Sequence, residues 1–134
     1  MNLPELKIGK LVAQVPIIQG GMAIRLSTAP LAAAVANEGG IGLIAASGMG
    51  LDELRKEIRM ARELTGGKGI IGINAMVAAR QFLDLITTAA EEGIDLIVAG
   101  AGFSRDIFAV GRRYGVEVVP IVSSARLAQT AEKL

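Results

Sequence analysis

The segment Gly69-Ile70-Ile71-Gly72-Ile73-Asn74 decides the fold, because it is a short and continuously apolar run that ends in one polar amide. A strand with one buried face alternates apolar and polar side chains, whereas a strand covered on both faces is apolar throughout. The run therefore predicts a buried strand of a parallel sheet, with Asn74 at its carboxyl end.

The same pattern recurs along the chain at intervals of about 25 residues, the length of one strand and one helix. An amphipathic segment follows each run. In one of them Asp52 lies in the first turn, Leu54 and Ile58 share one face, and Gly66-Gly67 ends the helix. The predicted strands are residues 15–19, 41–45, 69–74, 95–99 and 116–122, and the predicted helices are residues 28–38, 51–64, 78–92, 104–114 and 124–134.

Two parallel α/β architectures fit this alternation of strands and helices. A five-stranded, flavodoxin-like doubly wound sheet has this natural length. The first five βα units of a (β/α)8 TIM barrel fit as well, since a complete barrel needs roughly 250 residues. Length favours the doubly wound sheet, and the motifs described below favour the barrel. In either case residues 1–134 form a single domain, in the second case a partial barrel that lacks its C-terminal units.

The composition excludes several classes of function. The chain is 51% hydrophobic, so it has enough apolar side chains for a core. With 14 basic and 13 acidic residues and only 3% aromatics, it lacks the basic excess and the stacking platforms of a nucleic-acid-binding protein. It has no cysteine and no histidine, which rules out disulfides, thiolate metal sites and the usual general base.

Targeting and membrane signals are not found in the sequence. Gly, Asn or charged residues interrupt every apolar stretch well before the roughly 20 residues of a membrane span. The start, Met1-Asn2-Leu3-Pro4, lacks the basic and apolar regions of a signal peptide. We therefore expect a cytoplasmic protein that has no membrane partner.

Candidate binding residues follow the predicted strands, because ligands of parallel α/β proteins bind at the carboxyl ends of strands. Glycine and alanine there let backbone groups approach a flat ligand closely. The amides of Gln19 and Asn74 offer donors and acceptors to a heterocycle such as an isoalloxazine. None of these loops has the lysine or arginine of a phosphate site. The strand ends are Gln19-Gly20-Gly21-Met22, Ala45-Ala46-Ser47-Gly48-Met49-Gly50, Asn74-Ala75-Met76, Gly100-Ala101-Gly102 and Ser123-Ser124.

Structural interpretations compete with binding at these positions. Gly20-Gly21 is compatible with a simple tight turn, and each of the methionines 22, 49 and 76 fits core filling better than binding. Asn74 favours binding, because an amide at a strand end needs hydrogen-bond partners. We expect Ser123-Ser124 to cap the last helix, Ser27 or Thr28 to cap the first, and the charged helix faces to be solvated.

Taken together, these segments resemble the nitronate monooxygenase (2-nitropropane dioxygenase) family and the related flavin-dependent enoyl-ACP reductases. Pro16-Ile17-Ile18-Gln19-Gly20-Gly21-Met22 resembles their first barrel strand, and Ile71-Gly72-Ile73-Asn74-Ala75-Met76 resembles their Gly-Val-Asn-Ile-Met segment. The resemblance covers nearly the whole chain as the N-terminal portion of such a protein, and it continues in order through residues 31–42, 99–102 and 119–124.

The resemblance implies a (β/α)8 barrel that binds FMN. Gly21 and Met22 would lie against the flavin ring, and Asn74 would hydrogen-bond the cofactor. The family's catalytic histidine and phosphate-binding loops follow strands that lie beyond Leu134, so no catalytic residue is assigned within the chain. The other residues implied at the mouth of the site are Gly20, Ala45, Ala46 and Gly100.

The function implied by the resemblance is an FMN-dependent oxidoreductase that oxidises alkyl nitronates or nitroalkanes with O2. An enoyl-ACP reductase that uses NAD(P)H on an acyl substrate is the alternative within enzymes. A flavodoxin-like binding module is the non-enzymatic alternative, although a receiver-type module would place acidic residues where Gln19-Gly20-Gly21 stands. A partial barrel also has open strand edges and an uncovered inner face, which predicts a homo-oligomer or pairing with the missing C-terminal part.

Overall fold

A computed structural model describes residues 3–134. Met1 and Asn2 begin the segment that lacks a signal-peptide pattern, and they lie outside the described residues. The strands are β1 (Leu6–Ile8), β2 (Leu11–Ala13), β3 (Ile41–Ala45), β4 (Ile70–Met76), β5 (Leu96–Gly100) and β6 (Glu117–Pro120). The helices are α1 (Ala29–Asn37), α2 (Leu51–Leu64), α3 (Phe82–Glu91), α4 (Asp106–Tyr114) and α5 (Ala125–Glu132).

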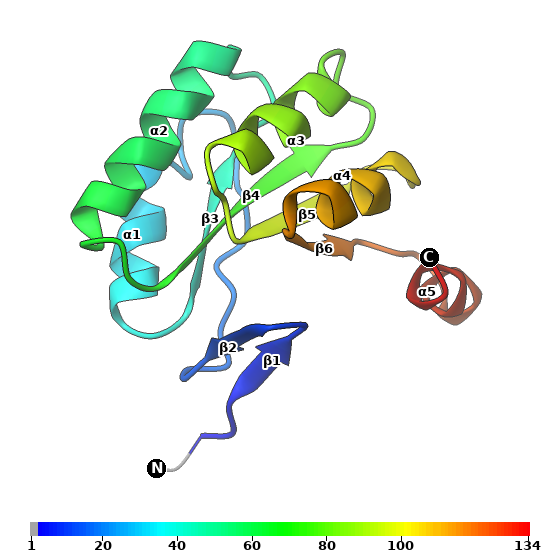
Figure 1. The fold of residues 1–134 in the computed structure, drawn as a ribbon, viewed down its shortest axis with the longest axis horizontal. Helices are drawn as coiled ribbons and strands as arrows, with labels where there is room; N and C mark the ends of the chain where they lie inside the picture. Colours follow the sequence, from blue (N-terminus) through cyan, green and yellow to red (C-terminus); the bar gives the residue numbers. More distant parts are fainter. Residues whose placement is uncertain (1–2) are drawn as a thin grey trace.

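The main sheet has four parallel strands in the order β3-β4-β5-β6, so each strand pairs with the next one along the chain. Helices α2, α3 and α4 connect these strands, α1 precedes β3, and the four helices cover one face of the sheet (Figure 1). A doubly wound sheet reverses its strand order and carries helices on both faces. The arrangement is therefore that of a partial barrel, and the flavodoxin-like alternative is wrong.

The strand predicted over residues 15–19 is the main error in the predicted elements. This segment runs beside β3 but forms only one isolated bridge, between Ile18 and Ile41. Pro16 has no N–H to donate, and the N–H of Ile17 bonds to the carbonyl of Val15 within the same segment. The described sheet consequently has four regular strands where five were predicted.

A short antiparallel hairpin, β1 and β2, precedes that segment and was not predicted. Gly9, in its turn, has a φ of +54°, a conformation that glycine adopts without strain. The hairpin packs on the inner face of the main sheet, where side chains of β3 and β5 form a small second core. The backbone N–H of Lys10 also donates to Glu117 Oε1 at 3.0 Å, so the turn is attached to the beginning of β6.

Helix ends follow the predicted signals in part. The Ser124 hydroxyl accepts the N–H of Leu127 at 3.2 Å and caps α5, as expected. The predicted cap of α1 is wrong, since Thr28 occupies the cap position without a side-chain cap bond. The carboxylate of Glu57, on α2, accepts the N–H of Ala29 at 2.6 Å instead. Helix α3 begins at Phe82, not at residue 78, because the preceding residues form hydrogen-bonded turns.

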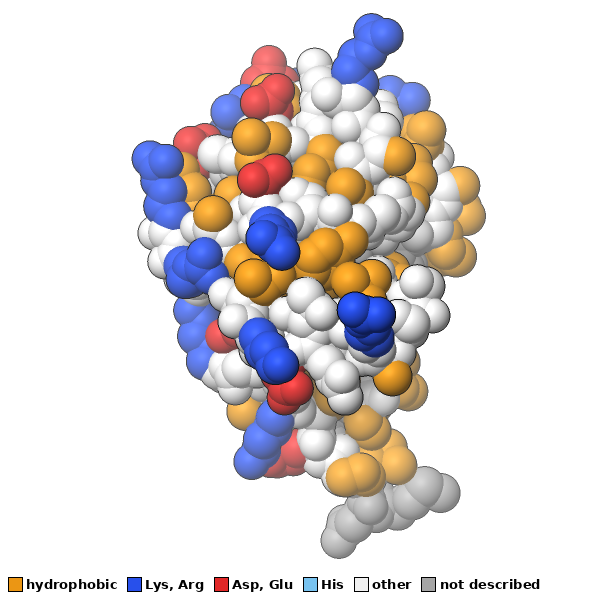
Figure 2. All heavy atoms as spheres, turned by 90° about the vertical axis from the view of Figure 1, so that its right-hand side faces the viewer, with side chains coloured by type: hydrophobic (Ala, Val, Ile, Leu, Met, Phe, Trp, Pro, Cys, Tyr) orange, Lys and Arg blue, Asp and Glu red, His pale blue; other side chains and the backbone are white. Residues whose placement is uncertain are grey.

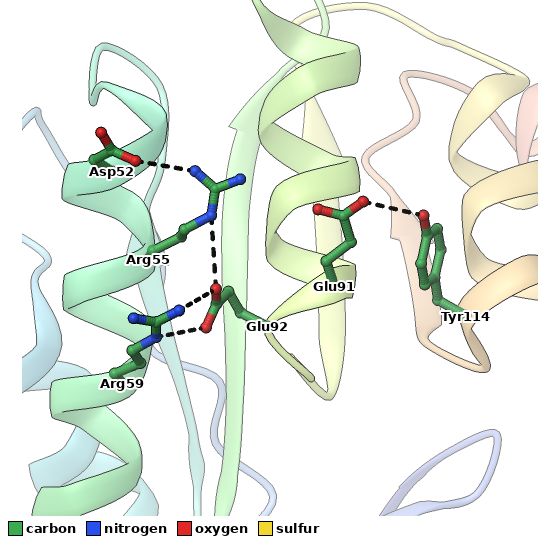
Figure 3. A network of polar contacts seen from close by, with 6 residues as sticks. All are labelled: Asp52, Arg55, Arg59, Glu91, Glu92 and Tyr114. Atoms are coloured by element: carbon green, nitrogen blue, oxygen red, sulfur yellow. Dashed lines mark hydrogen bonds and ion pairs between the residues drawn. The ribbon is translucent and has the colours of Figure 1, made fainter.

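The polar faces of α2 and α3 meet in a network of ion pairs, shown in Figure 3. Arg59 donates to both carboxylate oxygens of Glu92 at 2.8 Å, and Arg55 lies 3.6 Å from the same carboxylate. The neighbouring Glu91 contacts the Tyr114 hydroxyl at 3.4 Å, on the side of α4. Contrary to the expectation from sequence, the charged face of α2 is therefore not simply solvated, because it links two βα units.

The Glu92 pair predicts a pH-dependent contribution to stability. The hydrogen bond from Arg59 holds the pKa of Glu92 below its ordinary value of 4.5. Because the pKa is lowered in the folded state, the contribution is present above the unfolded pKa and is lost as the pH falls through the folded pKa. We expect Glu92→Gln to lower the free energy of unfolding by about 0.5–1 kcal/mol at neutral pH. The difference from wild type should shrink at acid pH, the second condition, as Glu92 becomes protonated in the folded state as well.

Urea unfolding of both proteins at the two pH values measures this difference. Glu91→Gln is the matched control, because it removes the adjacent carboxylate but leaves the arginine pair in place. A Glu92→Gln deficit that persists unchanged in acid would show that charge does not cause it.

Within residues 3–134, no helix is both long and apolar enough to cross a lipid bilayer.

Candidate functional site

A cavity of about 350 Å³ lies at the carboxyl ends of β3 and β4, under the loop that follows residues 15–19. Three of the five predicted strand ends contribute to its wall. The cavity is therefore formed by segments far apart in sequence that the parallel sheet brings to one edge. The lining residues are Gly21, Met22, Ala23, Ile24, Ala45, Ser47, Asn74 and Met76.

Gly21 packs directly against the side chain of Asn74 in this cavity. A Cβ built on Gly21 would lie 2.3 Å from Asn74 Cβ and 2.9 Å from its Cγ, which is far inside contact distance. A Cβ built on the neighbouring Gly20 would meet nothing within 4 Å. Of the two glycines, only Gly21 is required for this close approach of backbone to amide.

The Asn74 side chain offers its polar groups to the cavity. The residue is half-buried at the edge of β4, and its backbone carbonyl accepts the N–H of Ala46 at 2.9 Å. Within residues 3–134, the side-chain amide of Asn74 has no hydrogen-bond partner. An amide has two donor hydrogens and an acceptor oxygen, so Asn74 is able to bind both kinds of group on a ligand edge.

The structure separates the predicted site residues into two groups. Four of them line the cavity together, namely Gly21, Met22, Ala45 and Asn74. The other three do not line it. Gly20 turns its carbonyl towards Ser27, Ala46 is fully buried in the core, and Gly100 packs beside Ile121 and accepts the N–H of Val77.

The methionines likewise differ from one another. Met49 is 4% exposed and belongs to the core, so the core-filling interpretation is confirmed for it. Met22 and Met76 are 49% and 46% exposed and both line the cavity, so core filling does not explain them. Their flexible thioether side chains present an apolar, polarisable surface to whatever the cavity holds.

Four lining residues were not among the predicted site residues, namely Ala23, Ile24, Ser47 and Met76. The Ser47 hydroxyl accepts the N–H of Met76 at 2.8 Å and thereby ties the loop after β3 to the end of β4. Ile24 lies over Gly48, since a Cβ built on Gly48 would be 2.6 Å from Ile24 Cδ1. The position of Ser47 in a strand-end loop could have identified it as a lining residue from the sequence. No local pattern singles out Ile24.

The wall of the cavity is electrically neutral, because none of its lining residues is charged. The charged residue nearest in sequence, Arg25, is engaged with Glu53 of α2 at 2.9 Å. A neutral wall with one amide and apolar surfaces suits an uncharged ring better than a phosphate group. These side chains are suited to hold and orient a ring, and they include no ordinary proton-transfer group.

Comparison with known sequences identifies a family and a relative. A sequence model described as nitronate monooxygenase matches residues 5–104. The chain is also 28% identical over 114 residues to a Mycobacterium tuberculosis (strain ATCC 25618 / H37Rv) protein, the (3aS,4S,5R,7aS)-5-hydroxy-7a-methyl-1-oxo-octahydro-1H-indene-4-carboxyl-CoA dehydrogenase. The alignment covers 85% of this chain and 31% of the dehydrogenase.

Comparison with solved structures agrees with the observed fold. FabK from Thermotoga maritima superimposes with a TM-score of 0.82 at 35% identity, over 88% of this chain and 37% of FabK. Nitroalkane oxidase from Streptomyces ansochromogenes gives a TM-score of 0.77 over 90% of this chain and 44% of the oxidase, and its 23% identity shows likeness of fold alone. The chain spans less than half the length of each of these proteins.

Proposed function

This chain belongs to the nitronate monooxygenase family, and we propose that it forms one wall of an FMN site in an oxidoreductase that acts on alkyl nitronates. The packing of the Gly21 backbone on the Asn74 side chain carries the proposal. Because of this packing, the Gly21 backbone and the Asn74 amide lie side by side at the carboxyl edge of a parallel sheet. This edge is where the fold binds its ligands.

The residues present fit the ring of FMN. Gly21 lets the loop backbone rest on the Asn74 side chain, Asn74 matches the alternating donors and acceptors of the ring edge, and Met22 and Met76 offer apolar contact. When bound, FMN supplies the electron-accepting ring. The chain's own residues orient that ring and shield it from water on one side. The neutral wall does not fit the phosphate of FMN, which we assign to residues outside this chain.

A direct test of the ring site is titration of the chain with riboflavin and FMN, followed by flavin fluorescence. We expect the two ligands to bind equally well, because the chain contacts the ring and not the phosphate. A strong preference for FMN would contradict this division of the site. A chain that binds neither ligand would contradict the ring site itself.

The substrate is proposed to be an alkyl nitronate or nitroalkane with O2 as the oxidant, as the family name suggests. A second candidate is an acyl substrate with NAD(P)H as the reductant, and the CoA thioester in the name of the Mycobacterium relative favours it. The complete gene product distinguishes the two. Rapid anaerobic bleaching of its flavin by NADH or NADPH would support the second candidate. Nitronate-dependent O2 consumption without NAD(P)H would support the first.

We also propose that the inner face of the sheet is covered in the working protein, by a second copy or by a further part of the polypeptide. Met76, at the end of β4, and Ile121, directly after β6, are 46% and 55% exposed. Figure 2 shows apolar side chains among basic ones on the side of the molecule that carries α5. An apolar surface that is exposed to solvent favours association with a partner that covers it. A cytoplasmic location stays a prediction.

A further inference from the structure

Ser27 is a polar residue with no exposed surface, and it lies two residues before the start of α1. Its hydroxyl accepts the backbone N–H of Met22 at 2.9 Å and lies 3.4 Å from the carbonyl oxygen of Gly20, to which it donates. The amide Nε2 of Gln19 donates to the Ser27 hydroxyl oxygen at 3.3 Å. The hydroxyl therefore bonds back to the loop at the cavity and not forward to the helix.

These contacts use the whole hydrogen-bonding capacity of the hydroxyl, which has one donor and two acceptor sites. They bracket Gly21, since the two backbone bonds go to Gly20 and Met22. The Ser27 backbone carbonyl also accepts the N–H of Ala45 at 2.8 Å, and Ala45 lines the cavity from β3. Ser27 thus connects two of the three segments that form the cavity wall.

We propose that Ser27 is a positioning residue, whose hydroxyl fixes the Gly20–Met22 turn so that the Gly21 backbone rests on Asn74 and the cavity keeps its shape for the ligand ring. The inference rests on the proposed function. Ser27 does not line the cavity, so its effect on a ligand passes through the backbone of the turn. Without the hydroxyl, the Met22 N–H and the Gly20 carbonyl lose the partner that links them to the buried Ser27, and the turn is expected to change conformation.

A buried hydroxyl could instead serve only the stability of the fold, and a matched control separates the two roles. Thr65 is also buried, and its hydroxyl bonds to the carbonyls of Ala61 and Arg62 at the end of α2. Thr65→Ala therefore removes a buried hydroxyl that bonds only within the end of its own helix and has no contact with the cavity. Both variants are expected to lower stability, but only Ser27→Ala should alter the loop.

The experiment measures two properties of the 134-residue chain. The first is hydrogen exchange of the Met22 amide relative to amides of β4, and the second is affinity for riboflavin. We expect Ser27→Ala to speed Met22 exchange by about tenfold or more and to weaken riboflavin binding by about tenfold. Thr65→Ala should leave both at the wild-type value. If Ser27→Ala does not fold, Ser27→Cys replaces it, because a thiol keeps similar volume but bonds weakly.

Unchanged Met22 exchange in the Ser27 variant would overturn the inference, and so would wild-type riboflavin affinity in that variant. A wild-type chain that binds no riboflavin would overturn the proposed function instead. In that case Met22 exchange alone decides the inference, since it reports the positioning of the turn without any ligand.

Discussion

Gly21→Ala is expected to weaken riboflavin binding by about tenfold to a hundredfold, whereas Gly20→Ala should leave it unchanged. The methyl group added at position 21 would lie 2.3 Å from Asn74 Cβ, so either the loop or the amide must move. Both belong to the cavity wall, and a shift of either one changes the shape that receives the ring. Overpacking of this kind typically costs about 1–3 kcal/mol, which sets the expected range.

Gly20→Ala is the matched control for that experiment. It adds the same methyl group one residue earlier, where nothing lies within 4 Å, and it makes the same change in backbone freedom. Fluorescence titration of the two variants and the wild type under one condition gives the comparison. Equal affinities of the Gly20 and Gly21 variants would refute the cavity as the ring site.

Gly42→Ala is expected to give the largest loss of stability, about 3 kcal/mol or more in the free energy of unfolding. A Cβ built on Gly42 would lie 1.9 Å from the carbonyl oxygen of Ala32 and 2.5 Å from its carbonyl carbon. These atoms belong to the backbone of α1, so no side-chain rotation relieves the overlap. Helix α1 would have to move away from β3, which would open the core between them.

Urea unfolding measures this loss, with Gly50→Ala as the control. Gly50 occupies the cap position of α2 with a φ of −71°, and a Cβ there would meet nothing within 4 Å. Its replacement should change the free energy of unfolding by less than about 1 kcal/mol. A Gly42→Ala variant as stable as the Gly50 variant would mean that α1 moves freely on the sheet.

Several elements could be predicted from local pattern alone. Strand β3 has the predicted bounds, and so does α2, because continuous apolar runs and amphipathic periodicity are properties of a short segment. Strand β6 is shorter than predicted and α3 starts later. Ends of this kind depend on which hydrogen bonds the neighbouring turn makes, and composition does not specify these.

The elements that could not be predicted depend on partners distant in sequence. Residues 15–19 have the composition of a strand, yet they make only one bridge to β3, between Ile18 and Ile41. The hairpin of β1 and β2 is short and owes its place to contacts with the inner face of the sheet. Similarly, Glu57 caps α1 from another helix, so the local cap signal at Ser27 and Thr28 was misleading.

The sequence by itself determined the chemistry available at the strand ends: glycines, small residues, two amides and no charge. Only the tertiary structure decided which of these residues meet. Alternation along each strand and the register between strands send Asn74 to the cavity and Ala46 to the core, although Asn74 ends one predicted strand and Ala46 directly follows another. The contact of Gly21 with Asn74 joins residues far apart in the chain, and only the folded arrangement of the sheet and the loop before α1 brings them together.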